Sequence, residues 1–373
     1  MRIAVNASFF KKDHSGNDRN FFFDLFLKQS QIHSKHTFIF IFNKLYPSSL
    51  VFPENIIPVV IGPEGRTPLT WRIWHNFKIP SVLKKYKADI FITEKFCSLR
   101  TNVPQLLFYP DLNFIHQPWL VNEKHLSFYK KYTPLFLDKC DAVVVDSTSS
   151  KNDLMHRYQI DEQKVSVFFP IVDEGFRPLN YEEREIIKEK YAEGHEYFIY
   201  NGIISPHQNL KNLLKAFSAF KKRQKSSMQL LIAGEPGVGY EEWLSALGLY
   251  RFHAEVKVLH NVSESETKKI VAAAYAMVYT PFFETSYKAP LQAMACEVPL
   301  IVADAGALPE VCGDSALHAD PNDFKAIAEK MMLLFKDERL RKDLIQKGAQ
   351  QLKNVTSTRL PIHPFHGFSF FES

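Results

Sequence analysis

The stretch "YTPFFETSYKAPLQAMACEVPLIVADAGALPEVCGDSALHADP", residues 279–321, decides the fold that we expect for the second half of the chain. It begins as an apolar strand, turns over "ETSYKAP", continues as a helix at "LQAMA" and ends in a second apolar strand, "VPLIVAD". This order is typical of a parallel sheet with crossover helices. Glu284 stands at the turn, and Gln292 follows it in the helix, with Lys288 between them. Because α/β sheets bind ligands beyond the carboxyl ends of their strands, the turn is a candidate binding site.

The same alternation of apolar strands and periodic helices runs along the rest of the chain. Strands are expected at 2–8, 36–43, 88–93, 105–110, 142–147, 196–202, 228–234, 255–261, 276–282 and 299–304. Helices are expected at 19–29, 74–86, 148–158, 212–224, 263–276 and 289–296, with one long helix at 323–353. Capping residues at 147–150 and 263–266 mark two of the helix starts. The pattern predicts an α/β protein with two tandem Rossmann-like, doubly wound domains that face an interdomain cleft.

Domain boundaries follow from length and from a change of pattern. The chain has 373 residues, too many for one compact core. Between residues 170 and 190 a strand gives way to a proline-containing turn and a heavily charged helix. We therefore expect an N-terminal domain at 1–178 and a C-terminal domain at 179–350. The tail at 351–373 contains two prolines and a glycine and has no helical period, so we expect it to be atypical.

Composition narrows the class of protein. Hydrophobic residues make up 46% of the chain and charged residues 23%, as in ordinary globular proteins. A net charge of +5 is too small to indicate a nucleic-acid-binding protein. Scattered cysteines without C-x-x-C spacing are typical of thiols in a reducing compartment. We find no signal-peptide pattern and no apolar run near the roughly 20 residues of a membrane span, so we expect a cytoplasmic protein.

Two more turns that follow strands are candidate anion sites. The turn "KKDHSGNDRNFF" contains Gly16, where the backbone can approach an anion; an ordinary turn is the alternative. In "YNGIISPHQNLKNLLKAF" a strand ends and a helix starts, with His207, Gln208 and Lys211 at the corner. A helix N-terminus attracts anions, and lysine adds positive charge. Plain surface exposure is the alternative for His207, and helix capping is the alternative for Glu284.

Three stretches together resemble the retaining glycosyltransferases of family four: "NGIISPHQNLKNLLKAF", "PQLLFYPDLNFIHQP" and the one quoted first. The resemblance implies the GT-B fold, a role such as polysaccharide biosynthesis, and catalysis without a metal or other cofactor. It also implies a nucleotide-diphosphate sugar donor, such as a GDP- or UDP-sugar, on the C-terminal domain. A glycan or lipid-linked acceptor would bind the N-terminal domain, and transfer would retain the anomeric configuration.

The resemblance also assigns roles to residues. Glu284 matches the family's first glutamate, which holds the donor sugar, and Gln292 stands where a second glutamate contacts the ribose. Asp111 fits the family pattern in "YPDLNFIHQP", as does His116, and Asp111 joins Glu284 as a catalytic candidate. The other donor-binding candidates lie on the glycine turn and at the two helix corners: Gly16, His207, Gln208, Lys211, Ser286, Tyr287 and Lys288.

Several positions depart from the family pattern, and they leave two hypotheses open. The departures are Thr285, Ser286 and Tyr287 for Gly-Phe-Gly, His207 and Gln208 for Arg-Lys, Pro110 for histidine, and Glu297 for glycine. Each lost charge-assisted hydrogen bond weakens donor binding by about 1.5–3 kcal/mol. Either Lys211 and Lys288 supply substitute cations in an active transferase, or the protein is a catalytically silent relative that acts as a binding or partner subunit. No strand is followed by G-x-G-x-x-G, which disfavours a nicotinamide-dependent oxidoreductase.

The segment "WRIWHNFKIPSVLKKYK", residues 71–87, mixes aromatic and basic residues. Trp71, Trp74 and Phe77 alternate with Arg72, Lys78 and three further lysines. Such a basic amphipathic segment is typical of a helix that lies on an anionic membrane surface, here the inner membrane face. The alternative is a solvated helix whose aromatic side chains are buried.

Overall fold

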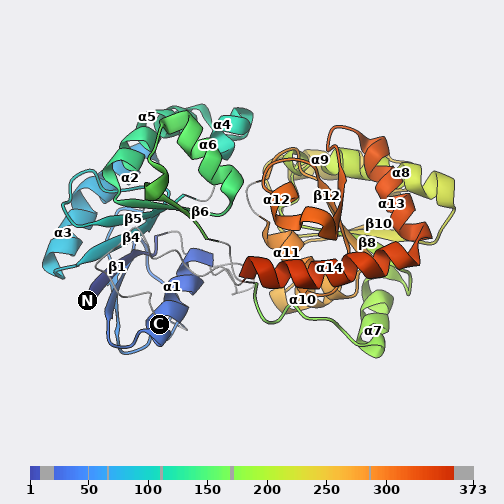
Figure 1. Ribbon diagram of the computed structural model, residues 1–373, viewed down its shortest axis with the longest axis horizontal. Helices are drawn as coiled ribbons and strands as arrows, with labels where there is room; N and C mark the ends of the chain where they lie inside the picture. Colours follow the sequence, from blue (N-terminus) through green and yellow to red (C-terminus); the bar gives the residue numbers. More distant parts are fainter. Residues whose placement is uncertain are drawn as a thin grey trace. The chain divides into compact units, whose positions relative to one another are not determined.

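The computed structural model describes residues 1–8, 21–48, 50–64, 67–109, 112–168, 172–284 and 287–356. The chain divides into two compact units, one holding the described residues up to Phe168 and the other those from Val172 to Thr356. Each unit is a parallel sheet with helices packed on it (Figure 1). The expectation of two α/β domains is therefore confirmed.

The first unit contains a seven-stranded sheet with strand order β3-β2-β1-β4-β5-β6-β7. Every paired strand in it is parallel to its neighbour. The elements are β1 (Arg2–Asn6), α1 (Phe21–Ile32), β2 (Thr37–Phe42), β3 (Ile56–Val60), α2 (Pro68–Ile73), the π-helical turn η1 (Trp74–Lys78), α3 (Ile79–Lys85), β4 (Ile90–Glu94), β5 (Gln105–Phe108), α4 (Asn113–His116), η2 (Pro118–Leu120), α5 (Glu123–Lys139), β6 (Ala142–Val145), α6 (Thr148–Tyr158), η3 (Glu162–Lys164) and β7 (Val165–Val167).

The second unit contains a six-stranded parallel sheet with strand order β10-β9-β8-β11-β12-β13. Its elements are α7 (Tyr181–Ala192), β8 (Tyr197–Asn201), η4 (Pro206–Gln208), α8 (Leu210–Gln224), β9 (Gln229–Ala233), α9 (Tyr240–Leu247), η5 (His253–Glu255), β10 (Val256–Leu259), α10 (Glu264–Ala272), β11 (Ala276–Tyr279), α11 (Lys288–Ala295), β12 (Leu300–Ala303), α12 (Leu308–Cys312), η6 (Gly313–Ser315), β13 (Ala316–Ala319), α13 (Phe324–Lys336) and α14 (Glu338–Thr356).

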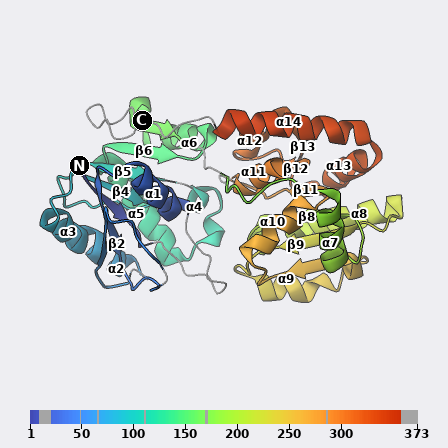
Figure 2. The ribbon, with the colours of Figure 1, turned by 90° about the horizontal axis from the view of Figure 1, so that it is seen from below.

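Helices cover both faces of the second sheet, which explains why its central strands read as unbroken apolar runs. All residues of β9, β11 and β12 are buried. Helix α8 packs against α13, and α10 packs against α7 and α11. Helix α14 lies along α11 and α12, as the two views in Figures 1 and 2 show. The strand positions are therefore fixed by one continuous core.

The expectation of one helix at 323–353 is wrong, because the structure has two helices, α13 and α14, that meet at Asp337. The backbone of Asp337 is extended, with φ −120° and ψ 90°. Its carboxylate accepts a hydrogen bond of 2.9 Å from the backbone N–H of Leu340. Aspartate is a preferred residue at helix starts for this reason, and here it begins a second helix without interrupting the apolar period.

The two capping signals in the sequence are confirmed. Ser147 caps α6 through the N–H of Ser150, and Ser263 caps α10 through the N–H of Glu266. Glu297, in place of the family's glycine, adopts a left-handed backbone with φ 57°. The turn after α11 also has the two hydrogen bonds of a Schellman motif, from Glu297 N–H to Met294 and from Val298 N–H to Ala293.

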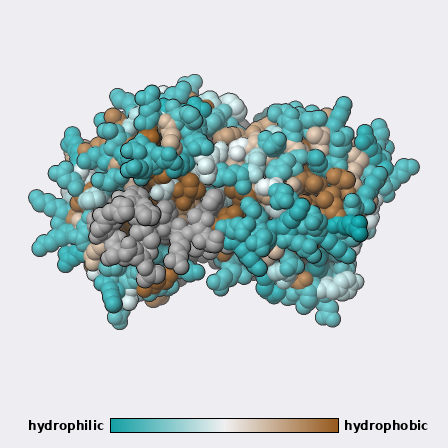
Figure 3. All heavy atoms as spheres, in the orientation of Figure 1, coloured by the Kyte–Doolittle hydropathy of each residue, from teal (hydrophilic) through white to brown (hydrophobic). Residues whose placement is uncertain are grey.

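Hydrophilic residues cover most of the face drawn in Figure 3, and hydrophobic residues form small, separate patches on it. Among the described helices, none is long and apolar enough to cross a membrane. The four cysteines are buried free thiols: Cys97, Cys140, Cys296 and Cys312.

Candidate functional site

The candidate site of the second unit lies where the direction of its sheet reverses. Strands β8 and β11 are neighbours, but the chain leaves β8 toward β9 on one side and leaves β11 toward β12 on the other. Open α/β sheets bind ligands at such a switch point, beyond the carboxyl ends of the strands. Two strand-to-helix corners meet there, one between β8 and α8 and the other between β11 and α11.

Most of the predicted donor-site residues lie at these two corners. Glu284, Tyr287, Lys288 and Gln292 follow β11, while Gln208 and Lys211 follow β8. The backbone of His207 lies in η4, also after β8. Residues more than seventy positions apart in the sequence therefore come to one edge of one sheet.

Glu284 is held at this edge by a tyrosine. Its side chain is 7% exposed, and its Oε2 accepts a hydrogen bond of 2.8 Å from the hydroxyl of Tyr279 at the end of β11. The N-cap residue of α11 is Tyr287, which makes no side-chain capping bond. Glu284 is therefore not the N-cap residue of α11, and its partner comes from the strand.

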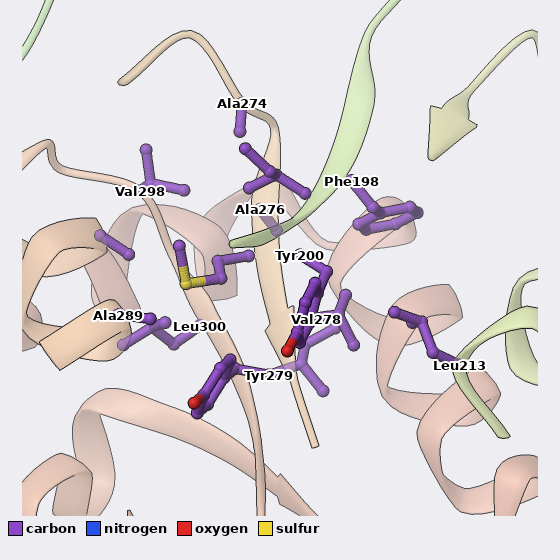
Figure 4. Packing of buried hydrophobic residues seen from close by; sticks show 14 of the residues in the cluster. Phe198, Tyr200, Leu213, Ala274, Ala276, Val278, Tyr279, Ala289, Val298 and Leu300 are labelled. Carbon is purple, nitrogen blue, oxygen red and sulfur yellow. The ribbon is translucent and has the colours of Figure 1, made fainter. Parts of the chain in front are cut away.

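Two stacked tyrosines lie at the strand ends next to this carboxylate. The rings of Tyr200 in β8 and Tyr279 in β11 are 5.7 Å apart and almost parallel, and Figure 4 shows them side by side. Burial and the charge of Glu284 raise the pKa of both phenols well above the ordinary value. Both hydroxyls therefore stay protonated, and that of Tyr279 remains a donor to Glu284 at every physiological pH.

A glycine fixes the backbone of Glu284 from the next loop. The carbonyl oxygen of Glu284 accepts a hydrogen bond of 2.9 Å from the N–H of Ala307. Gly306, beside it, has φ +61°, and a Cβ added there would lie 2.2 Å from the same oxygen. Only glycine fits this approach, so the β12–α12 loop locks the position of Glu284.

Gln292 links the two corners. Its side chain is 7% exposed, and its Oε1 accepts a hydrogen bond of 3.1 Å from Nδ2 of Asn201 at the end of β8. The remaining NH₂ group of Gln292 carries two donor hydrogens, which suit a hydroxyl oxygen.

The β8–α8 corner is held by Asn209, the N-cap residue of α8, whose backbone is left-handed with φ 60°. Its Nδ2 donates to the carbonyl oxygens of Thr280 at 2.8 Å and of Pro321 at 2.7 Å. It therefore joins the ends of β8, β11 and β13. Its Oδ1 is buried and has no hydrogen-bond partner among the described residues, and the same holds for Oε1 of Gln208.

The two candidate cations are exposed at the starts of their helices. Lys288 is the first residue of α11, and Lys211 is the second residue of α8. The charge of Lys288 also reaches Asp173: burial alone would raise the pKa of that carboxyl, but hydrogen bonds from Lys268 and Gly175, with the charge of Lys288, lower it. The ring of Tyr287 is fully buried in the core, so only the backbone of this predicted donor-site residue lies at the corner.

Three predicted residues lie outside the described residues: Gly16, Asp111 and Ser286. In the first unit, the Nε2 atom of His116 in α4 lies 2.5 Å from a carboxylate oxygen of Asp153 in α6. In the described ranges, no group of three or more His, Cys, Asp or Glu side chains could hold a metal ion.

Sequence reasoning missed the residues that hold the site together. Tyr279, Asn201, Asn209 and Gly306 act through partners in other loops. Polar residues at the last position of a buried strand are the signal that could have identified Tyr279 and Asn201.

Two family models match the chain. Glycosyltransferase Family 4 matches residues 33–176, and Glycosyl transferases group 1 matches residues 182–351. Between them they span most of both units. The chain belongs to the glycosyltransferases of family four. The resemblance found in the sequence is confirmed, and so is the expectation that the protein is a glycosyltransferase.

Named relatives agree with this class. O-antigen chain mannosyltransferase B of Escherichia coli is 23% identical over 295 residues, which are 78% of this chain and 77% of the relative. O-antigen chain mannosyltransferase RfbU of Salmonella typhimurium is 25% identical over 301 residues, which are 75% of this chain and 76% of the relative. Among solved structures, Anabaena HepE in complex with UDP and glucose has a TM-score of 0.71 at 12% identity and covers 96% of each chain. The GT-B fold class is therefore confirmed.

Proposed function

We propose that this glycosyltransferase transfers a hexosyl group from a nucleotide-diphosphate sugar to a hydroxyl of a glycan or lipid-linked acceptor, with retention. The bond between the anomeric carbon and the diphosphate oxygen breaks, and a bond to the acceptor oxygen forms on the same face of the sugar. The nucleoside diphosphate leaves, and the acceptor hydroxyl loses its proton.

The observation that carries this proposal is the buried carboxylate of Glu284 at the switch point of the second sheet. It is oriented by Tyr279 through a 2.8 Å hydrogen bond and by the β12–α12 loop through its backbone. A carboxylate held in this way can accept hydrogen bonds from two sugar hydroxyls without reorganising, which favours tight and specific orientation of a sugar. Gln292, held by Asn201, would contact the ribose.

We propose further that lysines replace a metal ion as the partner of the diphosphate. Lys288 and Lys211 stand in the first turns of α11 and α8, where the helix dipoles also favour an anion. The protein would then need no metal or other cofactor. His207, Gln208, Ser286 and the Gly16 turn would complete the donor site, as the family resemblance implies.

The acceptor would bind the first unit, with Asp111 as a catalytic candidate there. The names of the two mannosyltransferase relatives make mannose the first sugar to test and an O-antigen chain the first acceptor. A transferase of this kind would work at the cytoplasmic side of the inner membrane.

The experiment is a transfer screen with a panel that includes GDP-mannose, UDP-glucose and UDP-N-acetylglucosamine. Wild-type protein and Glu284→Gln are compared, because glutamine keeps an oxygen for Tyr279 and removes the charge. We expect transfer with at least one donor, an anomeric configuration unchanged by NMR, and a loss of about 100-fold in Glu284→Gln. Activity in excess EDTA should equal activity with magnesium.

A rate in Glu284→Gln equal to that of the wild type would contradict the assignment of the site. Binding of a donor without any transfer or hydrolysis across the panel would instead favour the silent relative. An inverted product would rule out retention while leaving the donor site intact.

A further inference from the structure

The helical segment α2–η1–α3 carries a stripe of exposed side chains at every fourth residue. Leu69, Ile73 and Phe77 are 62%, 37% and 53% exposed, and Ser81 and Lys85 continue the stripe in exposed positions. Residues four apart lie on one face of a helix. Helix α2 contributes no buried residue at all. Large apolar side chains on this stripe therefore face solvent.

The π-helical turn keeps the stripe on one face. In an α-helix a four-residue step rotates by about 40°, so a long stripe drifts around the axis, and a wider turn reverses part of that drift. The turn spans Trp74–Lys78 and precedes Pro80, which has no N–H to donate to the turn before it. The proline accounts for the π-helical turn, and the segment stays helical on both sides of it.

The two tryptophans of the segment pack against other parts of the first unit. Trp74 is 2% exposed and donates from its indole N–H to the carbonyl of Ile61 at 2.8 Å. Trp71 packs against Phe96 and Phe128. Of the three aromatic residues expected on the amphipathic segment, Trp71, Trp74 and Phe77, only Phe77 is exposed. The surface that remains is Leu69, Ile73 and Phe77, here called the apolar stripe.

The charged residues of the segment itself all have one sign. Between residues 67 and 88 the chain contains no aspartate or glutamate, and its basic residues are Arg72, Lys78, Lys84, Lys85 and Lys87. All of these are exposed. Arg100, from another loop, lies over the ring of Phe77 at 4.4 Å from its centroid. The segment that carries the apolar stripe is therefore purely basic, and a further cation, Arg100, lies against Phe77.

We propose that this face docks on the surface of an anionic lipid bilayer, with the apolar stripe inserted between headgroups and the lysines against lipid phosphates. Separate apolar side chains with cations on long, flexible stems suit a fluid surface that has no fixed partner geometry. A protein partner would instead need a continuous apolar patch, whereas the stripe has three apolar side chains and continues as Ser81 and Lys85. Each basic residue near an anionic leaflet adds attraction that salt weakens.

The test is flotation of the full chain with vesicles of phosphatidylcholine alone or mixed with phosphatidylglycerol, without any nucleotide sugar. We expect binding to the anionic vesicles at low salt, and loss of most of it when the ionic strength rises several-fold. The triple variant L69S/I73S/F77S should bind at least about tenfold less, and K78Q/K84Q/K85Q should lose the preference for anionic lipid.

Matched controls separate this face from general effects. I186S/L249S/L333S removes three exposed apolar side chains of the second unit, and K222Q/K325Q/K336Q removes three exposed charges there. Both should bind vesicles like the wild type, and thermal unfolding should show that every variant is folded. Absence of wild-type binding to any vesicle, or equal binding of the stripe variant and the wild type, overturns the proposal. The proposed function is untouched by either result, because the assay does not involve the donor site.

Discussion

After β11 the chain enters α11 past Glu284 and Gln292, whose side chains are bonded to residues of neighbouring strand ends. After β8 it enters α8 past Gln208 and Asn209, whose side-chain oxygens are buried and have no partner among the described residues. Both corners lie at the same edge of the same sheet. The β11–α11 corner is therefore preorganised, whereas the β8–α8 corner holds two buried acceptor oxygens that receive no hydrogen bond from the described residues.

The missing donors restrict what the β8–α8 corner can bind. Nδ2 of Asn209 points both its hydrogens at carbonyl oxygens, so Oδ1 cannot be exchanged for a donor by turning the amide. A diphosphate carries only acceptor oxygens and cannot satisfy this group, whereas a sugar or ribose hydroxyl can. In the proposed function, a diphosphate at this edge would therefore depend on backbone N–H groups and on Lys211 and Lys288.

The largest effect is expected from two glycines, each of which lets a neighbouring loop approach one of the corners. A Cβ at Gly306 would lie 2.2 Å from the carbonyl oxygen of Glu284, and one at Gly234 would lie 1.7 Å from that of Gly202. Gly306→Ala and Gly234→Ala should each lower the free energy of unfolding by about 3 kcal/mol, from backbone strain and overpacking together. Urea unfolding measures this change.

Gly248→Ala is the control, because that glycine has a helical backbone with φ −60° and nothing within 4 Å of an added Cβ. It should change stability by less than about 0.5 kcal/mol. Equal effects at all three positions would mean that the close approaches do not constrain the corners.

The next effect concerns the link that Asn209 makes between three loops. Asn209→Gly keeps the left-handed backbone and removes both hydrogen bonds, so the buried carbonyl of Thr280 loses its donor. We expect a loss of about 2 kcal/mol in urea unfolding, together with weaker donor binding. Gln208→Ala, one residue earlier, removes an oxygen without a partner and should leave stability nearly unchanged. A larger loss of stability in Gln208→Ala than in Asn209→Gly would show that Gln208, and not Asn209, holds the corner together.

The two candidate cations provide a direct comparison of the corners. If both reach the diphosphate, Lys288→Ala and Lys211→Ala should each weaken nucleotide-sugar affinity by about tenfold. Calorimetric titration measures this, with Lys222→Ala, an exposed lysine near the other end of α8, as the control. Unchanged affinity in Lys288→Ala with a loss in Lys211→Ala would assign the diphosphate to the β8–α8 corner alone.

The smallest effect is expected at the far ends of the two helices. Helix α8 is followed by Lys225 with φ 49°, and α11 by Glu297 with φ 57°. Glycine avoids the Cβ strain of this conformation but adds freedom to the unfolded chain, so Lys225→Gly and Glu297→Gly should each stabilise by up to about 1 kcal/mol. Lys222→Gly, inside α8, should destabilise by about the same amount in thermal unfolding. Destabilisation by Glu297→Gly would show that its side chain has a role outside the turn.

Sequence patterns predicted the strands that are buried on both faces, because such strands are continuous apolar runs. They missed β3, an edge strand that contains Pro58, and β13, whose four residues include His318. They also missed α5, whose apolar period is obscured by lysines and by Pro134. In each case tertiary packing, not local preference, decides the structure.

In the candidate site too, sequence patterns predicted some residues and missed others. Glu284 and Gln292 could be found from their spacing, since both follow one strand. The hydrogen bonds that Asn209 donates could not be found in this way, because their acceptors lie 71 and 112 positions away in the sequence. Nor could the contact of Gly306 with Glu284, which depends on a left-handed turn in a different loop.

Calorimetric titration of nucleotide sugars into wild-type protein and Glu284→Gln tests most directly whether the switch point between β8 and β11 is the donor site. One sugar nucleotide should bind the wild type at one site per chain, and Glu284→Gln should bind it at least about tenfold more weakly while unfolding at the same temperature. Equal affinity in the two proteins, or no binding of any donor by the wild type, would contradict the claim.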